Sequence, residues 1–194
     1  MRRLPLIPTL IVALAVAAMI ALGLWQLTDR LPKKEAFLAQ LADNPARPPV
    51  PFPTTPDDRL LFRRSAADCA PPVAVKLAGA GAAGFRSIAT CAGGTIVQLG
   101  TTRDPKAQVR WSGGPVTGYI GHAPDGRSLI GSLLDHRPPL PMLVAMPPAA
   151  GLSANAPPDI GAVPNNHLAY AGQWFFFAAI ATIVYVLAVR RRER

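Results

Sequence analysis

The side chains best suited to chemistry lie where the second of two long apolar runs begins. On a helix, His167, Tyr170 or Ala171, and Trp174 follow the i, i+3/i+4, i+7 pattern and therefore share one face. A histidine at the edge of an apolar span needs a polar partner or a role, and its imidazole can ligate a metal. We predict a ligand pocket at this level. Its candidate side chains are His167, Tyr170, Trp174, Trp25, Gln26, Asn165 and Asn166.

A purely structural interpretation explains several of the same residues. Asn165 or Asn166 can act as the N-cap of the helix that follows. The aromatic side chains Trp25, Tyr170 and Trp174 are typical of the belt that anchors spans at a membrane surface. In this interpretation the histidine would only cap the helix or donate a hydrogen bond.

The other titratable residues give little support for an enzyme. The chain has three histidines, lacks a Cys-x-x-Cys pair and shows no paired-carboxylate or His-x-Glu spacing. Residues 79–84 are rich in glycine but lack the Lys-Ser/Thr of a phosphate loop, so we expect a hairpin turn. His122 follows a turn-like glycine and His136 precedes Arg-Pro-Pro, so both are predicted to be solvated loop residues. We therefore expect no enzymatic activity and no catalytic residues.

Two apolar runs are long enough to place the candidate pocket at a membrane. Residues 4–24 carry no charge, and at about 1.5 Å per residue they reach about 30 Å, the thickness of a bilayer's hydrocarbon core. A cleaved signal peptide has a shorter apolar core of about 7–15 residues, although Ala15-Val16-Ala17 resembles a weak cleavage site. Residues 174–189 form the second run, which reaches spanning length when 167–173 supply its outer turns.

The distribution of arginine predicts the orientation of these spans. Four arginines lie in the tail 190–194, and no Lys or Arg occurs between Arg137 and Arg190, which places the carboxyl end in the cytoplasm. A single segment between two spans then puts the amino end, with Arg2 and Arg3, on the same side. Five units of the formal net charge of +9 belong to these tails. The charge therefore indicates topology and contact with anionic lipid, and we exclude nucleic acid as a partner.

The predicted fold is a membrane α+β protein in which two transmembrane helices flank a small extracytoplasmic domain, an antiparallel sheet or small barrel. Residues 45–56 are too rich in proline for a helix or central strand and form an extended connector, and residues 33–41 resemble a short amphipathic helix at the membrane surface. The predicted parts are an N-tail at 1–3, a helix at 4–25, the domain at 26–166, a helix at 167–189 and an Arg-rich tail at 190–194. The predicted strands are 60–63, 73–78, 85–91, 95–99, 108–111 and 116–120, with 143–146 as an edge strand.

The two cysteines are candidates for a disulfide. Cys69 and Cys91 are symmetric about Ala80, the middle of the Gly79-Ala80-Gly81 turn, and would lie opposite one another in a hairpin. An oxidising compartment would favour a bond between them. The alternative is a pair of buried thiols.

The segments that border both spans resemble those of the cytochrome c oxidase assembly family named for surfeit locus protein one (Shy-type). The family's Gly-x-Trp-Gln at the exit of its first helix is matched by Gly23, Trp25 and Gln26, and Lys33 matches a basic residue that follows. Its Pro-Asn-Asn-His-Leu-x-Tyr-Ala-x-x-Trp-Phe motif is matched by residues 164–175. The Arg-rich tail is also similar.

The chain departs from the family pattern at two places. The arginine that usually stands four residues after the tryptophan is Asp29 here, and Arg30 is displaced by one position. In a central strand, where relatives usually carry Val-Asn-Arg-Gly-Trp, the chain has Val97-Gln98-Leu99-Gly100-Thr101. The sequence is that of a divergent member which keeps the membrane-edge motif.

The resemblance implies a function in assembling an aa3-type haem-copper oxidase. It implies delivery or stabilisation of haem a, bound transiently, with His167 as a ligand or orienting group for the iron. The implied partners are the catalytic subunit of cytochrome c oxidase, a haem a synthase and membrane lipid. The alternative is a haem-free membrane scaffold that holds oxidase subunits during assembly. The short Met1-Arg2-Arg3 leader leaves no room for a mitochondrial transit peptide, so we expect a bacterial plasma (inner) membrane with the domain in the periplasm.

Overall fold

The computed structural model describes residues 5–127, 131, 135 and 137–193. The chain forms two compact units, residues 1–38 with 161–194, and residues 39–160. The helices are α1 Leu6–Trp25, the π-helical turn η1 Gln26–Arg30, α2 Leu31–Asp43 and α4 His167–Glu193, and the short 3₁₀ turns are η2 Asn44–Ala46, η3 Asp58–Leu60, η4 Gly81–Ala83 and η5 Ile160–Ala162. The strands are β1 Val50–Pro51, β2 Arg64–Cys69, β3 Ala74–Gly79, β4 Phe85–Thr90, β5 Ile96–Thr102, β6 Gly114–His122 and β7 Pro141–Ala145.

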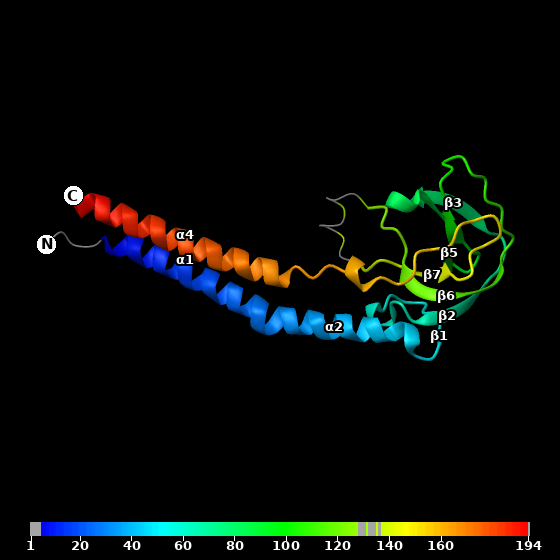
Figure 1. The fold of residues 1–194 in the computed structure, drawn as a ribbon, viewed down its shortest axis with the longest axis horizontal. Coiled ribbons are helices and arrows are strands. Elements are labelled where there is room, and N and C mark those ends of the chain that lie inside the picture. The colour runs from blue at the N-terminus through cyan, green and yellow to red at the C-terminus, as the bar shows by residue number, and fades with distance from the viewer. Residues whose placement is uncertain (1–4, 128–130, 132–134, 136, 194) are drawn as a thin grey trace. The chain divides into compact units, whose positions relative to one another are not determined.

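The first unit is a pair of apolar helices. Helices α1 and α4 lie side by side and run in opposite directions (Figure 1). By length and composition, the helical stretches Leu6–Ala46 and Ile160–Arg191 are each able to cross a membrane. Large apolar side chains remain exposed along both helices, among them Leu10, Ile11, Leu14, Phe176, Ile180, Ile183 and Val184. Such a surface suits contact with lipid, because exposing this much apolar surface to water would be unfavourable.

Small residues let the two helices approach closely. Ala171 and Ala178 are buried on α4, and Gly23 is buried on α1. A Cβ atom added at Gly23 would stand 2.7 Å from Cε1 of the Phe175 ring. In lipid, apolar burial supplies little drive for helix pairing, so close packing at small residues has to supply it. The glycine is therefore a requirement of the helix pair.

A hydrogen bond also joins the helices near their other ends. The Thr9 hydroxyl donates to the Pro5 carbonyl at 2.8 Å, and Thr9 Oγ1 also contacts the Tyr185 hydroxyl. Because a threonine hydroxyl has one proton, the Tyr185 hydroxyl is the donor to Thr9. The pair satisfies two polar groups within apolar helices.

The first helix continues beyond the predicted exit from the membrane. The helical conformation does not end at the family-like segment Gly23 to Gln26, because η1 and α2 follow α1 without a break as far as Asp43. The predicted amphipathic helix 33–41 lies within α2, and its place at a membrane surface stays a prediction. In the second unit, the buried Asn44 that follows α2 donates to the carbonyls of Arg59 at 2.8 Å and Leu61 at 2.7 Å.

The second unit is built on one seven-stranded sheet of order β1-β2-β6-β7-β5-β4-β3. The prediction of an antiparallel sheet is wrong in part, because β1 pairs with β2 and β5 pairs with β7 in parallel. The other neighbouring pairs are antiparallel. Strand β7 lies in the middle of this order, although it was expected at an edge. Its residues Met142–Ala145 contain no proline, which suits a buried central strand.

Most predicted strands form, with two exceptions. Residues 60–63 contain the end of η3 and a turn in which Phe62 has a φ of 67°, so the strand begins only at Arg64. Residues 108–111 form no strand. Within the predicted connector 45–56, Val50 and Pro51 form the short edge strand β1. The glycine-rich segment 79–84 makes the turn of the β3–β4 hairpin, as expected.

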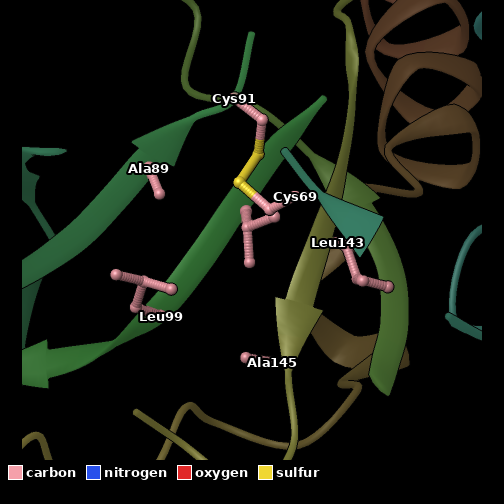
Figure 2. Close-up of a cluster of buried hydrophobic side chains, with 7 residues drawn as sticks. Cys69, Ala89, Cys91, Leu99, Leu143 and Ala145 are labelled. Atoms are coloured by element: carbon pink, nitrogen blue, oxygen red, sulfur yellow. A yellow bond between two sulfur atoms is a disulfide. The ribbon is translucent and has the colours of Figure 1, made fainter. Parts of the chain in front are cut away.

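The disulfide Cys69–Cys91 forms, although a hairpin does not bring the cysteines together. Cys69 ends β2, whereas the hairpin pairs β3 with β4 and leaves Cys69 outside. Three strands separate β2 from β4 in the sheet order, so the sheet curls to bring the Cα atoms of the cysteines to 5.3 Å. Figure 2 shows the sulfur–sulfur bond beside the buried Ala89, Leu99, Leu143 and Ala145. The bond thus closes the sheet over its core.

Valine in place of Gly23 will weaken the helix pair. The added side chain must displace the Phe175 ring, and overpacking of this kind costs about 1–3 kcal/mol. We expect a lower thermal unfolding midpoint of the detergent-solubilised chain for Gly23→Val. The matched control is Gly172→Val, because a Cβ at Gly172 meets nothing within 4 Å. Equal midpoints for the two variants would contradict the packing role of Gly23.

Loss of the disulfide will destabilise the second unit. Replacing Cys69 and Cys91 by serine removes a cross-link over a sequence separation of 22 residues, and the chain-entropy account of such a loop gives about 3 kcal/mol. The free energy of unfolding obtained from urea titrations should fall by that amount. Dithiothreitol should lower the urea midpoint of the wild type alone. A wild-type midpoint that is insensitive to dithiothreitol would show that the bond carries no stability.

Candidate functional site

The site is built on the first turn of α4. The helix begins at His167, so Asn166 occupies the N-cap position and its carbonyl accepts the Tyr170 N–H at 3.0 Å. The neighbouring Asn165 has a buried side-chain oxygen with no hydrogen-bond partner among the described residues. His167 is thus held by a defined helix start.

Gln26 of η1 is the partner of the histidine. The Gln26 Oε1 atom lies 2.8 Å from Nδ1 of His167. A carbonyl oxygen only accepts, so Nδ1 carries the proton and donates it. In the neutral ring this leaves Nε2 with its lone pair, and no hydrogen bond engages Nε2 among the described residues. An imidazole oriented through one nitrogen and available at the other is the arrangement of a metal-ligating histidine.

The π-helical turn alters which side chains gather at this point. The Leu31 N–H donates to the Gln26 carbonyl five residues earlier, in place of the α-helical partner four residues earlier. The Arg30 guanidinium lies 4.6 Å from the centre of the Trp25 ring. Asp29 forms an ion pair with Lys33. Turns of this kind are often found at functional sites.

The structure brings together part of the predicted pocket. Ala171 is 1% exposed on the face toward α1, whereas Tyr170 is 49% exposed, so of the two alternatives Ala171 shares the buried face with His167. Trp25 is 42% exposed. Trp174 is half-buried and packs edge-on against Phe177. The described side chains therefore form an open site beside the imidazole and do not enclose it.

Sequence analysis did not include Arg30 among the site residues. The displaced position of Arg30 relative to the family pattern was the signal that could have found it. No group of three or more His, Cys, Asp or Glu side chains that could hold a metal ion occurs within the part of the chain that the structure describes.

Of the other predicted loop histidines, His122 belongs to the second unit. His122 is the last residue of β6, not a loop residue, and its Nε2 lies 2.9 Å from Oδ1 of Asp58. His136 lies outside the described residues. The second unit has a hollow of about 610 Å³ partly lined by Asp125, Arg127, Asp135 and Arg137. Arg137 lowers the pKa of Asp135 well below its usual range through its hydrogen bonds, and all four charges lie in ion pairs.

The fold and the site define a class of protein: two helices of spanning length, a β-rich domain between them in sequence, and a histidine held at the edge of the helix pair. A model of the SURF1 family matches residues 13–179, which include both segments of the site, and the chain belongs to that family. Members of the SURF1 family are known as cytochrome oxidase assembly factors and are not enzymes. Searches of curated proteins and of solved structures found no match.

Removal of the Gln26 acceptor will change the tautomer of His167. In the wild type the proton resides on Nδ1, and in Gln26→Leu the ring loses the acceptor that fixes it there. Nitrogen NMR of the histidine-labelled chain in detergent should show one Nδ1-protonated ring, assigned by its loss in His167→Ala. That signal should shift toward a tautomer mixture in Gln26→Leu and stay unchanged in Gln173→Leu, which removes an exposed amide from α4. An unchanged signal in Gln26→Leu would contradict the role of Gln26.

Proposed function

We propose that this protein delivers or stabilises haem a for the catalytic subunit of an aa3-type cytochrome c oxidase. The observation that carries the proposal is the hydrogen bond from Nδ1 of His167 to Gln26, because it orients the ring and, in the neutral imidazole, leaves the lone pair on Nε2 for a metal. Imidazole is a common axial ligand of haem iron. Haem a is here a cargo, and its iron performs redox chemistry after transfer to the oxidase.

The side chains around the imidazole fit an amphipathic tetrapyrrole. Trp25, Tyr170 and Trp174 belong to the two segments that the Gln26–His167 hydrogen bond joins, and they offer apolar and aromatic surface there. The first backbone N–H groups of α4 have no partner within the helix, and the positive end of the helix dipole favours carboxylates there. A group with a metal centre, an apolar ring and acidic side groups meets a complementary surface on each count.

The open form of the site suits transient binding. The rings of Trp25 and Tyr170 are each nearly half exposed, so a ligand held there would keep one face accessible to a partner protein. A resident cofactor is usually enclosed more completely. We infer a carrier that receives haem a from its synthase and releases it to the oxidase.

The helix pair also supports the proposed topology. Because α1 and α4 are antiparallel, Arg190 and Arg191 lie at the same end of the pair as the start of α1 (Figure 1). Arginines near one end of a span favour the cytoplasmic side. The disulfide in the second unit favours an oxidising compartment. We propose that both chain ends are cytoplasmic and that the β-rich unit is periplasmic, in a bacterial inner membrane.

A haem-free scaffold is the second candidate. The same hydrogen bond between Gln26 and His167 connects η1 to α4, so the histidine could serve only to join the two helices. The exposed apolar faces of α1 and α4 would then contact oxidase subunits as well as lipid. The two candidates differ in whether pigment accompanies the purified protein.

Alanine in place of His167 will remove bound pigment. The chain is purified in detergent from cells that make haem a, as wild type, His167→Ala and the matched control His122→Ala, whose ring lies in the second unit beside Asp58. We expect a haem a band in the visible spectrum of the wild type and the control, and a loss of at least about tenfold in His167→Ala, since an axial ligand is removed.

One result would contradict the carrier function, and another would contradict the role of His167. Absence of pigment from all three proteins, together with cross-linking to oxidase subunits, would favour the scaffold. Equal pigment in all three would keep the carrier function and remove His167 as the ligand. Circular dichroism checks that each variant is folded.

A further inference from the structure

Arg30 is held in a position that its place in the sequence does not predict. In an α-helix the residue four positions after Trp25 would lie next to the indole on the helix surface, and that residue is Asp29. The π-helical turn inserts one extra residue into the helical repeat. As a result Arg30, five positions after Trp25, lies over the indole ring at 4.6 Å. The turn thus places a basic side chain over the face of the indole, while Asp29 still interacts with Trp25 through its carboxylate.

The neighbouring charges leave the Arg30 guanidinium available. The Asp29 carboxylate pairs with Lys33, whose Nζ lies 2.5 Å away, and Arg30 attracts it more weakly. Arg30 itself forms no ion pair with any described residue and is exposed. A guanidinium stacked on an aromatic face keeps its N–H edge free, and that edge matches a carboxylate in two hydrogen bonds.

The same turn holds the partner of the imidazole. The Gln26 carbonyl accepts the π-type hydrogen bond from Leu31, while the Gln26 side chain accepts from His167. Turn η1 also packs against α4. One short turn therefore presents a cation on Trp25 and also orients the imidazole of His167 on α4. A cation from η1 and a candidate metal ligand from α4 thus meet at the contact between these two elements.

We propose that Arg30, stacked on Trp25, binds a carboxylate of the tetrapyrrole whose iron His167 ligates. This inference rests on the proposed haem function and adds the residue that recognises the acidic side groups. The guanidinium pairs with the carboxylate while the imidazole holds the metal. This arrangement favours a ligand that carries both a carboxylate and a metal. The carboxylate of the tetrapyrrole is favoured over a lipid phosphate because the turn that presents Arg30 also orients His167.

The test compares two tetrapyrroles that differ only in their carboxylates. Iron protoporphyrin IX and its dimethyl ester are titrated into the full chain in a maltoside detergent, which contains no phosphate. The variants are Arg30→Gln and, as a matched control, Lys34→Gln, which removes another cation that lies over an aromatic ring, 5.2 Å from the centre of Phe37. We expect Arg30→Gln to weaken binding of the diacid about fivefold, the usual scale for a partly exposed charged pair. Binding of the ester and the position of the Soret band should not change, and Lys34→Gln should behave as the wild type.

The outcomes separate the two proposals. Unchanged diacid binding in Arg30→Gln, or an equal loss for diacid and ester, overturns the role of Arg30 while His167→Ala still reports on the ligand. Loss of phosphatidylglycerol from the purified Arg30→Gln protein, with unchanged diacid affinity, assigns Arg30 to lipid and also overturns it. A wild type that binds neither tetrapyrrole overturns both proposals.

Discussion

The site depends on how closely α1 and α4 approach each other. Gly23 and Ala171 offer almost no side chain to the interface, and Phe175 fills the space over Gly23. Only with the backbones this near can the Gln26 amide reach Nδ1 of His167 at 2.8 Å. In an apolar environment an imidazole N–H without an acceptor is costly, so the hydrogen bond in turn favours the paired state of the helices. Packing and polar satisfaction therefore support the same arrangement.

Much of the helical part could be predicted from the sequence. Apolar runs of spanning length and arginine asymmetry depend on composition, which needs no knowledge of distant contacts. The choice between Tyr170 and Ala171 could not be made, because both satisfy the helical spacing and only the neighbouring helix decides which is buried. The π-helical turn at Gln26–Arg30 was also out of reach, since the segment has an ordinary helical composition. Because the turn could not be predicted, the position of Arg30 over Trp25 could not be predicted either.

The sheet was predicted less well, for reasons of long-range pairing. Strand β2 contains Arg64, Ser65 and Asp68, so it lacks the apolar alternation that marks a strand. The strands of the parallel pairs β1–β2 and β5–β7 are not joined by a tight turn. Local sequence patterns therefore carry no information on their pairing. The cysteines were paired correctly for a reason that does not hold, because the curl of the sheet and not a hairpin brings them together.

One of the two departures of the chain from its family lies in the core of the second unit, whereas the other, at Asp29 and Arg30, lies in turn η1. Leu99 is 1% exposed within β5. The neighbouring Gln98 side chain donates to Asn155 at 2.7 Å, and Asn155 donates back to the Gln98 carbonyl and to the Ala145 carbonyl. In β5 this chain therefore has a buried leucine and a closed amide network, where its relatives usually carry an arginine and a tryptophan. Because the helix pair has its own packing and polar contacts, such a change in the sheet leaves the residues around His167 intact. The chemistry proposed for the family can therefore persist in a chain whose domain core has diverged.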